Sequence, residues 1–283
     1  DVLLNLINED PLEVISFWDN SDMQIINKGV ELNLTYYASP KPDFSFSIGA
    51  NATFLENEIR NAPFEFLVTS NSRGLANERI GIHTDGVSAN SFFMLDFTGF
   101  DANGNSNFRD INDDGVINDE DRIIAGNSIP TYYYNVSLAF NYKKWSLDLL
   151  FNGLGGNKVY NSTLSVLSKP FVANGLNGSP DNFVLAESET NSNRPSTRYL
   201  ENGAFLRLSN LTITYQFDMS RNNFCDQLRF YVTGQNLLLF TDYRGFDPEV
   251  SNAFSFGDLS GLGIDFTNYP IPMSFTAGIN VTF

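Results

Sequence analysis

Strict alternation of apolar and polar residues is the feature that most constrains the fold of this chain. The clearest case is the closing segment 275–283, whose apolar positions are Phe275, Ala277, Ile279, Val281 and Phe283. A repeat of two residues is typical of an antiparallel strand that is apolar on one face and polar on the other. The same alternation marks six further segments, at 30–36, 44–54, 134–142, 145–151, 211–217 and 228–232. Since the only weak helix candidate is 162–174, the sequence predicts an all-β protein.

Two architectures can use such strands, and the length and the polar face of each strand favour one of them. A soluble β-sandwich usually has strands of about 5–6 residues, whereas a tilted strand of about 9–11 residues can cross a bilayer. Several segments here run close to ten residues, and their polar positions are small and uncharged, as at Ser45, Ser47 and Asn51. Aromatic residues also cluster at both ends of the strands, as in the interfacial girdles of outer-membrane barrels. These features favour an antiparallel transmembrane β-barrel, or part of one.

Connection lengths point in the same direction. Short turns alternate with long connections at 55–131, 153–204 and 241–273. Outer-membrane barrels have short periplasmic turns and long extracellular loops. With an opening strand at 2–7, the sequence predicts eight barrel strands. The alternation of short and long connections then places Phe283 on the periplasmic side.

Charge and composition exclude other classes of function. The formal net charge is −16 and there is no basic run, so binding to nucleic acid is not expected. A single cysteine, Cys225, excludes an internal disulfide, and a single histidine, His83, argues against a zinc enzyme or a Ser-His-Asp hydrolase. Because no set of nucleophile, base and orienting group stands out, the chain is not expected to be an enzyme. No apolar run reaches the ~18 residues of a transmembrane helix.

Seven motifs, in their order and spacing, resemble the SusC/RagA-like family of TonB-dependent outer-membrane transporters of Bacteroidetes-type bacteria. They lie at 27–32, 110–117, 126–130, 205–208, 234–237, 241–250 and 280–283. The resemblance covers essentially all of 1–283 and is to the C-terminal part of the family. It implies a barrel of about 22 strands with a plugged lumen, of which this chain holds about eight. The plug, the first barrel strands and the segment that contacts TonB would then lie outside the chain. An independent eight-stranded barrel is the alternative.

The same resemblance implies a function and partners. Members of the family import nutrients too large for porins, such as oligosaccharides, other glycans or peptides, across the outer membrane. They work with a SusD-like lipoprotein at the extracellular face and with the TonB complex. The three long connections would form the surface that docks the lipoprotein, and lipids of the outer membrane would surround the strands. A secreted, calcium-stabilised β-sandwich that binds carbohydrate is the alternative function.

A possible calcium loop lies at 110–121, inside the connection 55–131. Oxygen ligands at positions 1, 3, 5, 9 and 12, a glycine at position 6 and a backbone carbonyl at position 7 match a calcium-binding loop. The predicted ligands are Asp110, Asn112, Asp114, the carbonyl of Val116, Asn118 and Asp121. The last ligand is Asp rather than Glu, which shortens its reach. A solvated acidic loop built from turn-forming residues is the other interpretation.

Aromatic residues in the last long connection are candidates for contact with substrate. Tyr243, Phe246 and Tyr269 could stack on sugar rings or on peptide side chains, or could belong to the interfacial girdle or the loop core. Asp247 and Glu249 flank a proline inside a motif of the family, so they are expected to fix the loop geometry.

Overall fold

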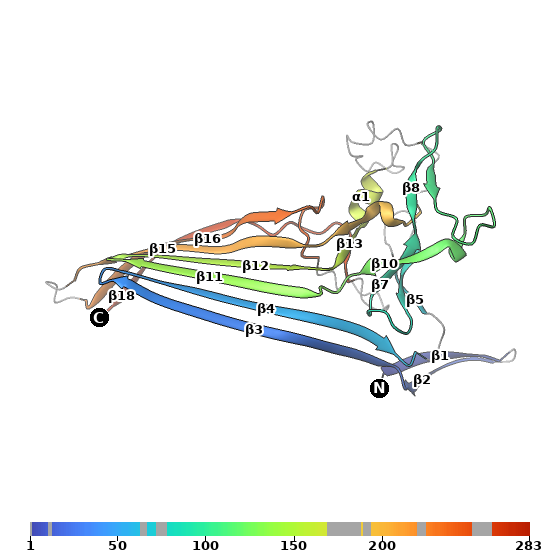
Figure 1. Ribbon diagram of the computed structural model, residues 1–283, viewed down its shortest axis with the longest axis horizontal. Coiled ribbons are helices and arrows are strands. Elements are labelled where there is room, and N and C mark those ends of the chain that lie inside the picture. The colour runs from blue at the N-terminus through green and yellow to red at the C-terminus, as the bar shows by residue number, and fades with distance from the viewer. Residues whose placement is uncertain are drawn as a thin grey trace.

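A seven-stranded antiparallel sheet dominates the computed structural model, which describes residues 2–10, 13–62, 67–71, 78–168, 188, 194–219, 225–250 and 262–283. The strand order is β18-β16-β15-β12-β11-β4-β3, and the strands run side by side along the length of the molecule (Figure 1). In chain order they are β3 (Gln24–Lys41), β4 (Phe44–Arg60), β11 (Tyr132–Tyr142), β12 (Trp145–Gly155), β15 (Phe205–Phe217), β16 (Gln227–Thr241) and β18 (Ser274–Thr282). The predicted all-β, antiparallel class is confirmed.

The register of the sheet joins the apolar positions of neighbouring strands into one surface, the apolar face. Leu138 of β11 lies opposite Ile48 of β4 and Leu149 of β12, and Leu149 lies opposite Leu211 of β15. Because side chains alternate along each strand, the residues between them form a second surface, the polar face.

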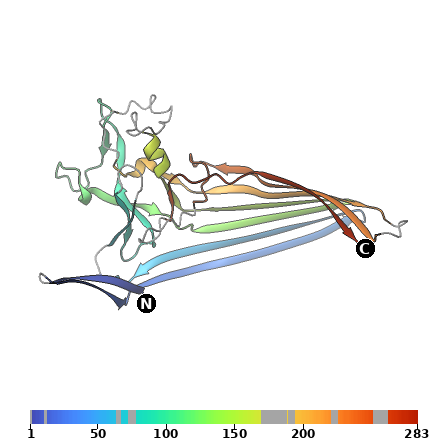
Figure 2. The ribbon, with the colours of Figure 1, turned by 180° about the vertical axis from the view of Figure 1, so that it is seen from behind.

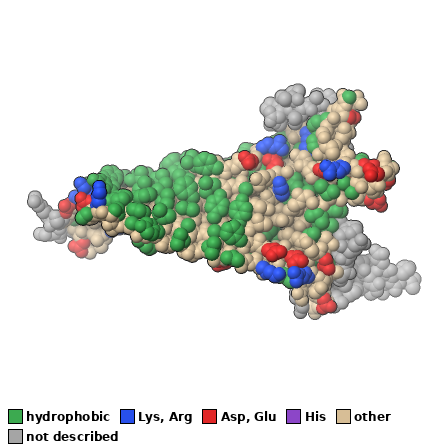
Figure 3. All heavy atoms as spheres, viewed as in Figure 1, with side chains coloured by type: hydrophobic (Ala, Val, Ile, Leu, Met, Phe, Trp, Pro, Cys, Tyr) green, Lys and Arg blue, Asp and Glu red, His purple; other side chains and the backbone are tan. Residues whose placement is uncertain are grey.

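The apolar face is exposed across most of the sheet. Leu34 is 71% exposed, Phe275 70% and Ile279 67%. Figure 3 shows a broad hydrophobic band over the strands, with charged side chains gathered at its two ends. No second sheet covers this face within the part of the chain that the structure describes, so the packing expected of a β-sandwich is not seen. An exposed apolar surface of this extent marks contact with a membrane or another protein.

Short turns gather at one end of the sheet and long connections at the other (Figures 1 and 2). The turns that join β3 to β4 and β11 to β12 have two residues each, at 42–43 and 143–144. Lys143 takes a left-handed conformation with φ 53°, as tight hairpins of this kind require. The C-terminus lies at the same end as these turns, as predicted.

The predicted opening strand at 2–7 is wrong as a strand of the main sheet. This segment lies in β1 (Val2–Asp10), which pairs with β2 (Glu13–Ser21) as a separate hairpin. The main sheet therefore has seven strands over the described residues, with β3 and β18 at its edges. β3 and β4 are also longer than predicted, since they continue toward the loop end as a paired ribbon.

Small sheets and a short helix occupy the long connections. The first connection holds a sheet in the order β10-β7-β6-β5 and the hairpin β8–β9, and the other two contribute the sheet β14-β13-β17. The bounds are β5 (Leu67–Asn71), β6 (Arg79–His83), β7 (Ser91–Leu95), β8 (Phe97–Phe100), β9 (Ser106–Phe108), β10 (Arg122–Asn127), β13 (Lys158–Asn161), β14 (Leu200–Asn202) and β17 (Ile264–Asp265).

The helices within the described residues are few and short. The 3-10 turns η1 (Asp119–Asp121) and η3 (Thr197–Tyr199) accompany α1 (Ser162–Leu167), which begins the predicted helix candidate. The rest of that candidate, from 169 on, lies outside the described residues. None of the helices described is long and apolar enough to span a membrane.

Candidate functional site

The three long connections share one hydrophobic core at the end of the sheet, and we call their described residues the loop unit. The core residues come from the first connection (Ile80, Phe92 and Met94), the second (Tyr160 and Tyr199) and the third (Ile264). Each of them is at most 2% exposed. The parallel pairing of β13 with β17 also joins the second connection to the third. The loop unit is thus a folded body and not a set of independent loops.

Polar contacts join the first and second connections. The backbone N–H of Phe97 donates to Thr197 Oγ1 at 2.9 Å, and the Thr197 hydroxyl donates to Asp96 Oδ1 at 3.1 Å. The guanidinium of Arg198 lies over the ring of Phe100, 4.7 Å from its centre. Such a cation–π contact contributes about 0.5–1 kcal/mol at an exposed site, so the contact adds to the shared core.

A buried ion pair holds the third connection against the sheet. Arg207 of β15 donates from Nη2 to both carboxylate oxygens of Asp247, at 2.7 and 2.8 Å. The two side chains are 5% and 7% exposed. Asp247 Oδ1 also accepts from the backbone N–H of Glu249 at 2.9 Å. Because a buried charge that lost its partner would be strongly destabilising, this pair fixes the loop, the role predicted for Asp247.

A second buried cluster lies where the third connection meets the second. The Tyr243 hydroxyl donates to Asp265 Oδ2 at 2.5 Å, and Asp265 is 2% exposed. Burial is the main cause that raises the pKa of the Asp265 carboxyl above its ordinary value, and nearby Glu201 adds to the effect, while hydrogen bonds from Tyr243 and Thr163 oppose it. Burial also raises the pKa of the Tyr243 hydroxyl. Glu201 in turn pairs with Arg244 at 3.2 Å.

The predicted substrate-contacting aromatics lie in different surroundings. Tyr243 is 5% exposed and its ring packs against Gly245, where a Cβ would lie 2.3 Å from the ring. Its ring therefore has no open face for stacking in this structure. Phe246 and Tyr269 are 67% and 89% exposed, so both present free rings at the loop end.

The predicted calcium loop is closed by its own side chains. Asp110 Oδ2 accepts from the backbone N–H of Gly115 at 2.8 Å, and Asp114 Oδ1 accepts from that of Val116 at 2.7 Å. Asp121, fully buried, accepts from the backbone N–H groups of Ile111 and Asn118, each at 2.8 Å. These two bonds lower the pKa of the Asp121 carboxyl, that from Asn118 being the larger cause.

Asn112 and Asn118 complete the hydrogen bonds of this loop. Asn112 Oδ1 accepts from Asp114 N–H at 3.1 Å, and Asn118 Oδ1 accepts from Glu120 N–H at 2.6 Å. The other carboxylate oxygen of Asp110, Oδ1, is buried without a hydrogen-bond partner. Across the described residues, no three His, Cys, Asp or Glu side chains gather as a metal site would require.

A row of four asparagines on the polar face was not predicted as a site. Asn33, Asn51, Asn135 and Asn152 are direct partners on the neighbouring strands β3, β4, β11 and β12. Asn135 Nδ2 donates to Asn51 Oδ1 at 2.9 Å, and a cavity of about 150 Å³ lies beside the row. Amide side chains both donate and accept, so the row can hydrogen-bond a polar, uncharged ligand. The alternation placed these residues on the polar face, but only the strand register could show that they are neighbours.

Comparisons with known proteins identify relatives along most of the chain. It is 27% identical to TonB-dependent receptor P3 of Formosa agariphila over 92% of its own length, and 26% identical to TonB-dependent receptor SusC of Bacteroides thetaiotaomicron over 91%. The chain spans 29% and 26% of the length of these relatives. No family model matches the sequence.

Solved structures show the same fold. The chain aligns over its full length with the RagAB peptide importer in its closed-closed state, at TM-score 0.80 and 24% identity. It aligns with the open-open state of the same importer at TM-score 0.77 and 26% identity. In both cases it covers about a third of the matched chain, 32% and 31%. The predicted resemblance to SusC/RagA-like TonB-dependent transporters, and the barrel fold that it implies, are confirmed.

Proposed function

We propose that this relative of the SusC/RagA-like TonB-dependent receptors forms part of an outer-membrane importer of large nutrients. The observation that carries the proposal is the exposed apolar face, continuous over seven strands and bounded by charged ends. In a bilayer this face would contact lipid, and the small polar residues of the other face would line the interior of the barrel. The loop unit would then stand on the extracellular side and the two-residue turns on the periplasmic side.

The proposed substrate is an oligosaccharide, another glycan or a peptide. The asparagine row supports a ligand with many hydrogen-bonding groups, because each amide offers both donors and an acceptor. Phe246 and Tyr269, whose rings are exposed at the loop end, are the proposed stacking residues. Tyr243 is a proposed substrate residue only in a state in which its side chain separates from Asp265.

The proposed partners are a SusD-like lipoprotein and the TonB complex. The lipoprotein would dock on the loop unit, which is preformed by its common core and would lose little conformational entropy on binding. TonB would act through the part of the receptor that lies outside this chain.

Uptake by whole cells tests this function. The full-length gene is inactivated in its host, and import of labelled oligosaccharides and peptides is compared with import after complementation, with and without a protonophore. We expect one substrate class to depend on both the gene and the proton-motive force. Unchanged import of every labelled substrate after inactivation would contradict the proposal.

The secreted β-sandwich is the second candidate, and the exposed apolar face argues against it. A sandwich would bury this face under another sheet. Extraction separates the two candidates, since a membrane barrel requires detergent and a secreted sandwich stays monodisperse in plain buffer.

We also propose that calcium binds the loop at 110–121. Asp110 Oδ1 lacks a hydrogen-bond partner and Asp110 lies beside the buried carboxylate of Asp121, so a cation there would neutralise closely spaced negative charge. Asp110, Asn112, Asp114, the Val116 carbonyl, Asn118 and Asp121 would supply the oxygens that calcium prefers. The loop already closes through its own hydrogen bonds, but Asp110, Asp114 and Asp121 do not gather as a metal site in this structure, so calcium would have to draw these carboxylates together and would thereby stiffen the loop.

Calorimetry on the full-length protein tests the calcium site. Asp110→Ala with Asp114→Ala should abolish one calcium-binding event and should make the loop as sensitive to protease as chelation does. Asp113→Ala, in the same loop but outside the ligand pattern, is the matched control. Equal calcium affinity in the double variant and the parent would show that this loop is not the site.

A further inference from the structure

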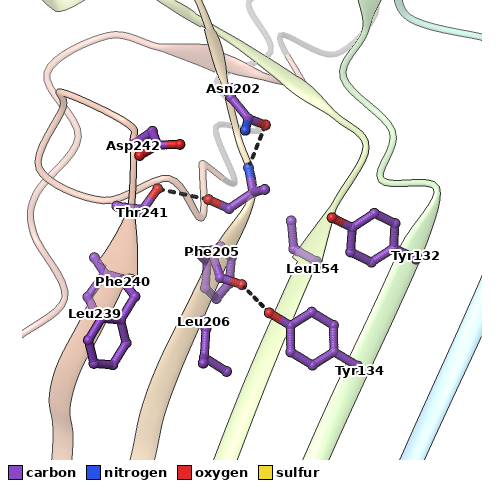
Figure 4. Close-up of a pocket in the computed structure, with 11 residues that line it drawn as sticks. Tyr132, Tyr134, Leu154, Asn202, Phe205, Leu206, Leu239, Phe240, Thr241 and Asp242 are labelled. Carbon is purple, nitrogen blue, oxygen red and sulfur yellow. Dashed lines mark hydrogen bonds between the residues drawn. The ribbon is translucent and has the colours of Figure 1, made fainter.

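A hollow of about 520 Å³ opens at the loop end of β11, β12, β15 and β16, and we call it the tyrosine hollow (Figure 4). Its lining includes two tyrosines of β11, Tyr132 and Tyr134, and apolar residues of β15 and β16, among them Leu206 and Phe240. Its volume lies in the range of about 300–1,000 Å³ that is typical of small-molecule sites.

The strand register places this hollow on the apolar face. Tyr134 lies opposite Gly153, Gly153 opposite Leu206, and Leu206 opposite Phe240. Tyr134 also continues the alternation of Val136 and Leu138 on its own strand. The hollow is therefore a depression at the upper end of the hydrophobic band, on the opposite face from the asparagine row.

Two glycines of β12 lie beneath the tyrosine rings of the hollow. A Cβ on Gly153 would lie 2.5 Å from the ring of Tyr134, and a Cβ on Gly155 would lie 2.3 Å from the hydroxyl of Tyr132. Because these positions carry no side chain, the tyrosine rings lie across the strand instead of standing away from it. The floor of the hollow is thus made of aromatic carbon and backbone.

The polarity of the lining changes along the hollow. Leu206 and Phe240 lie within the strands, toward the band, whereas Asn202, Thr241 and Asp242 lie at the strand ends, toward the loop unit. The Tyr134 hydroxyl donates to the Phe205 carbonyl at 3.1 Å, and the Thr241 hydroxyl donates to the Ala204 carbonyl at 2.8 Å. These internal hydrogen bonds occupy the hydroxyl protons of Tyr134 and Thr241, and the lining as a whole exposes polar and apolar atoms in similar measure. Asp242 is exposed at the polar rim.

We propose that the tyrosine hollow binds a membrane lipid with an amine head group. One acyl chain would lie along Leu206, Phe240 and the tyrosine rings, and the ammonium of the head group would meet the carboxylate of Asp242. This inference rests on the proposed function, since it requires the apolar face to contact lipid. The hollow is continuous with that face, and its apolar-to-polar order matches a lipid whose head group points to the extracellular side.

Native mass spectrometry of the detergent-purified full-length protein tests the proposal, with dipalmitoyl phosphatidylethanolamine as the probe. Leu206→Trp and Ala204→Phe both fill the hollow, and Leu238→Trp is the matched control on the apolar face of β16 outside the lining. We expect one retained lipid per parent chain and at least about a tenfold weaker retention in each filled variant, with the control unchanged. Asp242→Asn should remove the preference for this lipid over dipalmitoyl phosphatidylglycerol.

The opposite results would overturn the site. Full retention in both filled variants, or an equal loss in Leu238→Trp, would show that the lipid binds the band without using the hollow. Equal retention of the two lipids by the parent would overturn the role of Asp242. A parent protein that is monodisperse without detergent would instead overturn the proposed function, so the two failures are distinguishable.

Discussion

Two buried aspartates of the loop unit respond to pH in opposite directions. Asp121 has a lowered pKa because backbone N–H groups donate to its carboxylate, so its stabilising contribution is present above the ordinary value of 3.8 and is lost as pH falls through the lowered pKa. Asp265 has a raised pKa because it is buried, with Glu201 adding to the effect. Its contribution is present below 3.8 and is lost as pH rises through the raised pKa.

Asp265→Asn should therefore remove a pH dependence from the junction of the second and third connections. In the parent protein, hydrogen exchange at 243–250 and 262–267 should become faster as pH rises above about 4, after correction for the intrinsic rate. The variant should keep slow exchange over this range, because a neutral amide pays no cost of burying charge. Tyr243→Phe is the control, since it removes the hydroxyl donor but leaves the acid. An identical pH profile in parent and Asp265→Asn would contradict this assignment.

At the scale of the strand, side-chain alternation separates the apolar face, which is proposed to contact lipid, from the polar face, which is proposed to line the interior. Leu138 and Ser137 are neighbours on β11, yet they lie on the apolar face and the polar face. β11 and β12 have 11 residues each, the length that crosses a bilayer when tilted.

Leu138→Arg and Ser137→Arg form a matched pair that tests this orientation. Near the middle of a bilayer, an arginine facing lipid should lower the free energy of unfolding by about 2–4 kcal/mol, so Leu138→Arg should be strongly destabilised. Ser137→Arg should be much milder, because its side chain would reach the polar interior. Reversible unfolding of the full-length protein in lipid vesicles measures both, and equal costs would indicate two buried faces.

At the scale of the molecule, the loop unit behaves as one body because its core is shared. Ile264 belongs to the third connection but packs in the same cluster as Met94 of the first and Tyr199 of the second. A cut or a cavity in one connection is therefore expected to affect the other two.

Ile264→Ala tests this coupling. Truncating a buried isoleucine typically costs about 2–5 kcal/mol, and the loss should raise hydrogen exchange in β7, β13 and η3 together. Ile111→Ala is the control, since Ile111 is 44% exposed. Faster exchange confined to 262–265 would mean that the three connections fold independently.

The sequence by itself determined the class of this fold and the identity of its two faces. Alternation at 134–142 and 145–151 needs only the two-residue period of a strand, so it is readable without neighbours. The pairing of the predicted opening strand at 2–7 could not be read in the same way: the segment joins the next strand, β2, in a hairpin apart from the main sheet, and the pattern of one segment does not specify which strand it pairs with. The motif 241–250 could be recognised in the sequence, but the sequence did not show whether Tyr243 is buried or exposed.

Tertiary structure alone decided how distant residues meet. The asparagine row depends on the register of four strands, and the tyrosine hollow depends on glycines of β12 lying opposite tyrosines of β11. Arg207 and Asp247 are 40 residues apart in the sequence, and neither residue type indicates which residue it pairs with. The physical reason is that alternation is a local property of the backbone, whereas registers, shared cores and buried pairs are fixed by packing between segments far apart in the chain.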